Sequence, residues 1–75
     1  MGINNDKIDE LTLALLYLVT DDESHRAWKS FDWDTMDRLY KKGLISDPQN
    51  KNKSVAMSDE GFELSKKYFK KHFEI

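Results

Sequence analysis

Few side chains in this 75-residue sequence are of the types that perform catalysis or bind metal ions. The only histidines are His25, expected in an exposed loop, and His72, expected in a core or an interface; without any cysteine, a transition-metal site lacks ready ligands. The run Asp21-Asp22-Glu23 could attract a cation, but it lacks the alternating spacing and the glycine of a calcium-binding loop. Neither a glycine-rich phosphate loop nor a Gly-x-Ser-x-Gly elbow is present. The sequence therefore predicts a protein that is not an enzyme and that uses no cofactor or metal.

The lysines are the side chains best suited to contact nucleic acid. The net charge is −2, from 12 Lys and Arg against 14 Asp and Glu, which disfavours a protein that mainly binds phosphate backbones. The charges are nevertheless separated, because residues 1–40 contain four basic and nine acidic side chains, whereas residues 41–75 contain eight lysines and five acids. The possible DNA contacts are Lys41, Lys42, Lys51 and Lys53.

Trp28, Phe31 and Trp33 form the densest aromatic group, and Arg26 and Lys29 flank it. Such rings could stack on nucleotide bases and form a platform for a single strand. Aromatic side chains dominate the energetics of a small core, so we expect these rings to pack inside the domain. Replacing Trp33 with Ala would then cost about 3–5 kcal/mol and unfold the protein.

Helical spacing of apolar residues begins the chain and predicts a helix over residues 6–20, capped by Asn5. The repeat at three and four residues consists of Ile8, Leu11, Leu15 and Leu18. In the second half of this predicted helix, from Leu13 to Val19, every residue is apolar. Because a helix that is apolar all round is normally buried all round, we expect the second half of this helix to be the centre of the domain.

A second helix is expected over residues 32–42, capped by Ser30 or Asp32 and ended by Gly43. The segment 24–29 can form at most a short helix. Three aspartates lie near the start of the second helix, where the helix dipole favours negative charge: Asp32, Asp34 and Asp37.

The remaining segments predict a β-hairpin and a last helix. Residues 44–47 and 54–57 read as two short strands joined by a polar turn. Ser58 is typical of an N-cap, and a helix is expected over residues 59–73. The chain is therefore expected to be one domain, residues 1–75, that is mostly α with a small β-hairpin (α+β), in the order helix, short helix, helix, two-stranded hairpin, helix.

Apolar side chains cover an unusually wide arc of the last helix. A helical wheel with about 100° of rotation per residue places Phe62, Phe69 and Phe73 in one direction. A second apolar group lies roughly 140° away from them on the same wheel. One core needs only a stripe of about 100°, so we expect this helix to offer its second edge to a protein partner. A homodimer through this helix would enlarge a small core; alternatively, the N-terminal arm covers that edge. The expected interface consists of Leu64, Tyr68, His72 and Ile75.

Two runs resemble the end of the recognition helix, the wing and the following helix of MarR- and PadR-type winged-helix regulators: Gly43-Leu44-Ile45 and Met57-Ser58-Asp59-Glu60-Gly61. The resemblance covers about a third of the chain and implies a winged-helix-like fold, which serves DNA binding in some proteins and protein interaction in others. The 23 residues between Val19 and Gly43 are too few for a complete helix-turn-helix. The aspartates at the start of the expected recognition helix would also face a polyanion.

Nearly the whole chain is also similar to a family of short bacterial proteins catalogued as a domain of unknown function, especially in the runs Leu15-Leu16-Tyr17-Leu18 and Arg26-Ala27-Trp28-Lys29. This resemblance implies no activity. The longest apolar run, residues 13–19, is far shorter than the roughly 20 residues that span a bilayer, so we expect no membrane contact. The absence of cysteine suits a reducing compartment, and we expect a cytoplasmic protein.

Two functions are consistent with these observations. The first is a small protein-interaction module that binds an unidentified partner through the aromatic group or the last helix. The alternative is a weak DNA-binding protein that uses the lysine-bearing wing and the basic last helix, and its affinity would fall steeply with salt.

Overall fold

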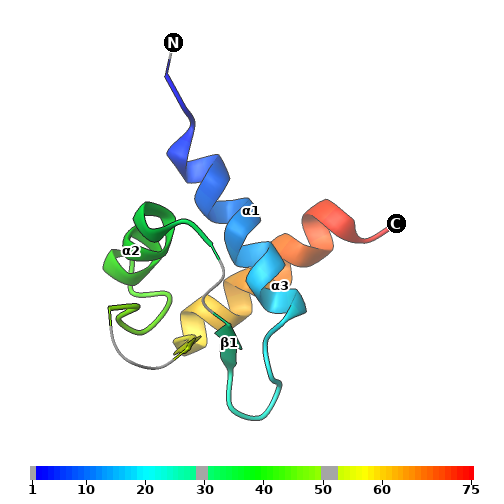
Figure 1. Ribbon diagram of the computed structural model, residues 1–75. Helices are drawn as coiled ribbons and strands as arrows, with labels where there is room; N and C mark the ends of the chain where they lie inside the picture. Colours follow the sequence, from blue (N-terminus) through cyan, green and yellow to red (C-terminus); the bar gives the residue numbers. More distant parts are fainter. Residues whose placement is uncertain (1, 29–30, 50–52) are drawn as a thin grey trace.

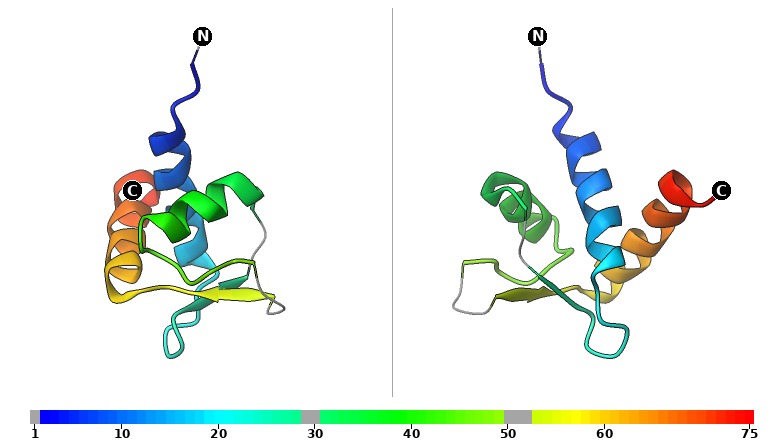
Figure 2. Two further views of the ribbon diagram at one scale, coloured as in Figure 1. Left: turned by 90° about the vertical axis from the view of Figure 1, so that its left-hand side faces the viewer. Right: turned by 45° about the vertical axis from the view of Figure 1, so that its right-hand side comes forward.

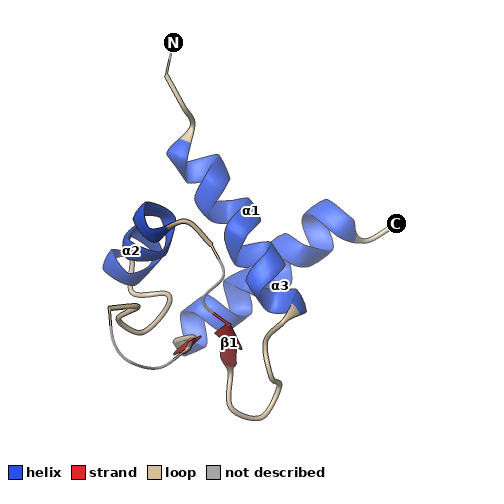
Figure 3. Cartoon of the chain, in the orientation of Figure 1, coloured by secondary structure: helices blue, strands red, loops and turns tan. Residues whose placement is uncertain are grey.

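The computed structural model describes residues 2–28, 31–49 and 53–75, and within these residues it contains three helices and one two-stranded antiparallel sheet (Figure 1, Figure 3). The predicted mostly helical fold with two short strands is confirmed, whereas the element order is α-β-α-β-α. The elements are α1 (Asn5–Leu18), β1 (Arg26–Trp28), α2 (Trp33–Lys41), β2 (Ser54–Ala56) and α3 (Asp59–Phe73).

The predicted winged-helix order is wrong because β2 pairs with residues 26–28, whereas the sequence predicted that it would pair with residues 44–47. The residues expected to form a short helix instead form β1, which pairs with β2 in the register Arg26↔Ala56 and Trp28↔Ser54. Buried Ala27 alternates with more exposed neighbours, which is the period of a strand rather than of a helix. The segment expected as the partner of β2 makes only a single bridge, Ile45↔Met57. The strand partner of β2 therefore precedes α2 instead of following it.

The caps place the three helices close to their expected bounds. The Asn4 side chain, rather than that of Asn5, caps α1 by accepting the Lys7 N–H at 3.0 Å. Asp32 caps α2, which confirms one of the two candidates, while Ser30 lies outside the described residues. Ser58 caps α3 as predicted, and that helix covers the predicted residues.

The core lies where α1 crosses α3 and packs beside α2 (Figure 2). Figure 2 also shows the two strands at one end of the molecule and the N-terminal arm projecting at the other. Four partly buried side chains pack against the core: Phe31, Phe62, Leu64 and Tyr68. The buried core side chains are Leu13, Leu16, Ala27, Met36, Leu39, Leu44, Ile45, Val55 and Met57.

The expectation that the second half of α1 is buried on all sides is wrong. Its covered face contains Leu13 and Leu16, whereas Ile8, Leu15 and Leu18 are exposed, the last at 64%. The physical reason is the size of the protein, because α2 and α3 cover one side of α1 and the described chain provides no further layer for the other. Among the described residues, no helix has both the length and the hydropathy that crossing a membrane requires.

The expectation that the tryptophans pack in the core is also wrong. Trp28 is 60% exposed and Trp33 is 61% exposed, and only Phe31 of this aromatic group packs against the core. On β1, Trp28 follows the buried Ala27, and successive side chains of a strand point to opposite faces. Trp33 is the first residue of α2, whose buried side is formed by Thr35, Met36 and Leu39.

Replacing Trp33 with Ala is therefore expected to lower the free energy of unfolding by less than about 1 kcal/mol, since little of the ring is removed from water. Leu39→Ala in the same helix is the matched control, and its full burial predicts a loss of about 2–5 kcal/mol. Urea unfolding of both variants measures the difference. A loss for Trp33→Ala as large as that for Leu39→Ala would contradict the exposed position of the ring.

Candidate functional site

Asp9 is a buried carboxylate that connects α1 to α2. Only 3% of Asp9 is exposed, and its oxygens accept hydrogen bonds from Arg38 Nε at 2.9 Å and from Lys42 Nζ at 2.8 Å. Burial would raise the pKa of Asp9, but the hydrogen bonds and charges of Arg38 and Lys42 outweigh burial and lower that pKa. The Arg38 side chain also donates to Thr35 Oγ1 at 3.1 Å. Asp9 is therefore ionised at neutral pH. It holds the side chains of Arg38, in α2, and Lys42, the C-cap of α2, against α1.

Glu10, the next residue, connects α1 to α3. Its Oε2 lies 2.5 Å from His72 Nε2 and 3.1 Å from Lys71 Nζ. The hydrogen bond with His72, followed by that with Lys71, lowers the pKa of Glu10. The two neighbouring acids of α1 thus point to different helices, one to α2 and the other to α3.

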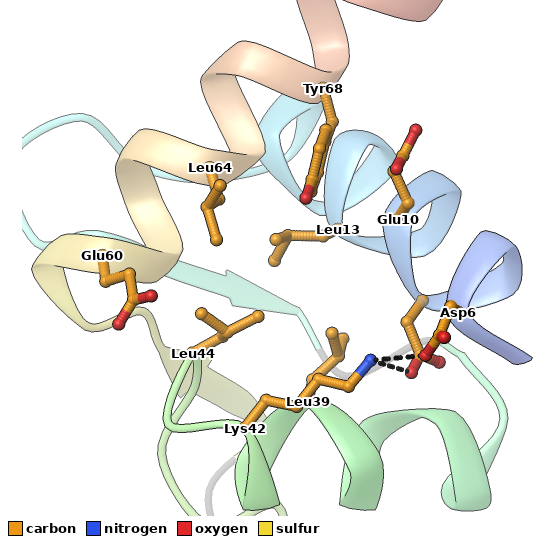
Figure 4. A pocket seen from close by; sticks show the side chains of 10 residues that line it. Asp6, Glu10, Leu13, Leu39, Lys42, Leu44, Glu60, Leu64 and Tyr68 are labelled. Carbon is orange, nitrogen blue, oxygen red and sulfur yellow. Dashed lines mark hydrogen bonds and ion pairs between the residues drawn. The ribbon is translucent and has the colours of Figure 1, made fainter.

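A groove of about 340 Å³ opens between the three helices (Figure 4). Its floor consists of the buried side chains Leu13, Leu39 and Leu44. Leu64 and Tyr68, both half-buried on α3, form one wall, and they point into the groove from the same helix in Figure 4. The groove therefore presents an apolar surface that is built from all three helices and the segment after α2.

Acidic side chains dominate the rim of this groove. The lining residues include four carboxylates, Asp6, Asp9, Glu10 and Glu60, and a single ammonium group, that of Lys42. Lys42 also lies 3.3 Å from Asp6, whose side chain is almost fully exposed. Glu60 is exposed and forms no ion pair with any residue that the structure describes. Asp9 and Glu10 already have cationic partners on α2 and α3, so the carboxylates that remain for a cationic group are Glu60 and the exposed Asp6 beside Lys42, while the floor suits an apolar group.

A close approach of α3 to the segment after α2 sets the width of the groove. A Cβ atom at Gly61 would lie only 2.0 Å from the Leu44 carbonyl oxygen, so this position of α3 has no room for a side chain. The Ser58 hydroxyl, one turn earlier, donates to the Gly43 carbonyl oxygen at 2.7 Å. These contacts hold the start of α3, including Glu60, beside the floor residue Leu44.

The lysines predicted to contact DNA do not form one free basic surface among the described residues. Lys41 pairs with Asp37 at 3.0 Å, and Lys42 is bonded to Asp9 and Asp6. Lys53 is exposed and lines a second hollow of about 250 Å³ next to β1 and β2. Lys51 lies outside the described residues.

The residues predicted to form a partner interface on α3 are divided between two environments. Leu64 and Tyr68 pack against the core and line the groove. His72 is half-buried at Glu10, and Ile75 is exposed beyond the end of α3. The structure thus brings two of the four to the groove wall and the others to the far end of the helix.

The two histidines and the acidic run do not form a metal site. His25 is half-buried rather than exposed, because its ring stacks on that of Phe62 at 4.0 Å between centroids. The carboxylate of Asp21 accepts the Ser24 N–H at 2.9 Å within the turn. In the parts of the chain that the structure describes, no group of three or more His, Cys, Asp or Glu side chains could hold a metal ion.

Sequence reasoning missed Asp9 and Arg38 as the polar connection between α1 and α2. A signal was present, because Asp9, Leu13 and Leu16 repeat at four and three residues and so share the core face of α1. An acid on that face indicates a buried ion pair, since an unpaired buried charge is costly. The groove itself had no comparable signal, because its lining comes from three separate helices.

Comparison with known proteins gives a family but no activity. The family model described as Domain of unknown function (DUF6429) matches residues 4–75. An uncharacterized protein of Sinorhizobium fredii, y4hR, is 51% identical over 73 residues, which cover 97% of each of the two chains. No solved structure matches the chain. The match over nearly the whole length, together with this relative, shows that the chain belongs to the DUF6429 family.

Proposed function

We propose that the protein is a protein-interaction module that binds a basic, amphipathic segment of a partner protein in the groove between α1, α2 and α3. The observation that supports this proposal is the combination of an apolar floor with a mainly acidic rim in one groove. A peptide helix that binds in a groove does so through apolar side chains at helical spacing, and its flanking charges give specificity.

The dimensions of the groove suit such a segment. About 340 Å³ is near the lower end of the range for binding pockets and accommodates a small number of large apolar side chains. Leu64 and Tyr68 remain half-buried without a partner and would be covered by one. Lys or Arg residues on either side of the inserted apolar side chain would reach Asp6 at one end and Glu60 at the other (Figure 4).

The alternative function, weak binding of duplex DNA, has less support. Lys41 and Lys42 are paired with carboxylates, so both would have to exchange an existing partner for a phosphate. Glu60 and the exposed Asp6 on the groove rim would also disfavour a polyanion that approached from the groove side.

The proposal predicts that a synthetic amphipathic helix of about 14 residues made of Leu, Lys and Ala binds the groove, whereas the same peptide with Glu in place of Lys does not. Amide chemical shifts of the labelled protein, followed during the titration, locate the site at α1, α2 and α3. The same titration with a short DNA duplex at low and moderate salt tests the alternative. Salt-sensitive shifts with DNA, or Leu-Lys peptide shifts away from the groove, would overturn the proposal.

Two variants separate the rim from general electrostatic attraction. Glu60→Lys is expected to weaken the Leu-Lys peptide about tenfold, because one rim carboxylate becomes a like charge. Asp59→Lys is the matched control: it is exposed in the same first turn of α3 and makes the same charge change outside the groove lining. Equal weakening by both variants would show that net charge, rather than the groove, attracts the peptide.

A further inference from the structure

The face of α1 that points away from the groove is a second apolar surface. Ile8, Leu15 and Leu18 are exposed there and, with the half-buried Leu11, occupy the positions i, i+3, i+7 and i+10 of one helix face. Val19, the C-cap, extends this surface by one residue. Figure 1 shows α1 crossing in front of α3 with no other element drawn over it from that side. We call this surface, formed by Ile8, Leu11, Leu15, Leu18 and Val19, the outer stripe.

The spacing of the outer stripe is that of a helix seam rather than of scattered surface residues. Steps of three, four and three residues are the a and d positions of a heptad, which two packed helices use to interlock side chains. Scattered exposed apolar residues are normal on a protein surface, whereas a continuous stripe indicates an interaction site. The helix α1 therefore has two apolar faces. One is covered by α2 and α3, and the other, the outer stripe, is not covered by any described element.

The charges around the outer stripe are of opposite sign at its two ends. At the N-terminal end Lys7 lies on the same side as Leu11 and Leu18, four and eleven residues later. Half of its side chain is exposed, and its ammonium group is 3.9 Å from Glu10 Oε2. The acids of this end, Asp6, Asp9 and Glu10, line the groove on the opposite side. At the C-terminal end the exposed loop after α1 carries Asp21, Asp22 and Glu23.

We infer that the occupant of the outer stripe is a second copy of this chain, with the two α1 helices antiparallel. In that arrangement Ile8 faces Leu18 of the partner subunit and Leu11 faces Leu15 of the partner subunit, so one two-fold axis relates the contacts. Lys7 then lies at the end that faces the partner's acidic loop, and the two helix dipoles oppose each other favourably. A parallel pair would instead bring the two acidic loops together.

This dimer surface is separate from the groove. The groove lining on α1 consists of Asp6, Asp9, Glu10 and Leu13, and none of these belongs to the outer stripe. The dimer would therefore present two accessible grooves, and it does not depend on the function proposed for them. It would also enlarge the buried apolar surface of a 75-residue chain, which is small for a single core.

Light scattering of the whole protein between micromolar and millimolar concentration is expected to show a mass that rises from 8.9 kDa to twice that value. Leu18→Glu should hold the protein at the monomer mass, since it places a charge in the stripe at an exposed position. Trp33→Glu is the matched control, because its side chain is equally exposed but lies on α2. A monomer at all concentrations, or a dimer that Leu18→Glu leaves unchanged, would overturn the inference.

Cysteine pairing tests the antiparallel orientation, and the chain has no native cysteine to interfere. Ile8→Cys and Leu18→Cys proteins are prepared separately, mixed and oxidised, and the products are identified by mass. The antiparallel dimer predicts a disulfide mainly between the two different variants, at least tenfold more than within either one. Disulfides mainly between two Ile8→Cys chains and between two Leu18→Cys chains would overturn the inference in favour of a parallel pair.

Discussion

Replacing Gly61 with Ala is expected to reduce the free energy of unfolding by about 3 kcal/mol, the upper range for an overpacked site. Helix propensity alone predicts the opposite sign, because Ala is about 1 kcal/mol more favourable than Gly inside a helix. The added Cβ would lie 2.0 Å from the Leu44 carbonyl oxygen and 2.8 Å from its carbonyl carbon. Both atoms belong to the backbone, so α3 or the segment after α2 must move.

Urea unfolding of Gly61→Ala measures this effect, and Gly43→Ala is the control for losing a glycine elsewhere. Gly43 has a φ of 77° but no atom within 4 Å of an added Cβ, so only backbone strain of about 1–2 kcal/mol is expected. Because Gly61 keeps α3 beside Leu44, peptide binding in the groove should weaken in any folded Gly61→Ala protein. Stabilisation of the protein by Gly61→Ala would contradict the close approach.

Replacing Asp9 with Asn is expected to reduce the free energy of unfolding by about 2 kcal/mol. Removing one member of a buried ion pair costs about 3–5 kcal/mol, and the figure is smaller here because Arg38 and Lys42 keep partial access to water, with 29% and 43% of their side chains exposed. Asp37→Asn is the control: it breaks the exposed pair with Lys41, which is expected to contribute less than about 0.5 kcal/mol. Similar losses for both variants would contradict the role assigned to Asp9.

The same variant should change how stability depends on pH. The pKa of Asp9 is lowered in the folded protein, so its contribution is complete above the ordinary carboxyl pKa of about 3.9 and is lost as the pH falls below it. The unmodified protein should therefore lose stability more steeply than Asp9→Asn between about pH 4 and pH 2. Melting temperatures across this range measure the two slopes, and equal slopes would show that Asp9 is not preferentially ionised by folding.

The helices could be predicted because their limits depend on neighbouring residues. Ser58 and Asp32 accept backbone N–H groups three residues later, and such caps are recognisable in the sequence. The sheet could not be predicted in the same way. Arg26 and Ala56, which pair across it, belong to segments on either side of α2, and nothing in the local pattern specifies that pairing.

The candidate site was partly predictable. Leu64 and Tyr68 were recognised as apolar side chains beyond the needs of a single stripe, and both line the groove. The sequence offers Lys42 as a possible DNA contact, whereas in the structure α1 places Asp9 and Asp6 beside it. Charge in the sequence gives the sign of a group but not its partner.

Local sequence is sufficient for the approximate extent of the helices, for the caps at Asp32 and Ser58 and for the glycine that ends α2, since these depend on contacts within about four residues. Long-range packing selects which face of α1 is buried and which strand pairs with β2. It also brings Asp9 within hydrogen-bond distance of Arg38, which follows it by 29 residues in the sequence. The physical reason is that burial and ion pairing require surfaces from separate elements. In this short chain, α2 and α3 cover the face of α1 that holds Asp9 and Leu13 and leave Ile8, Leu15 and Leu18 exposed.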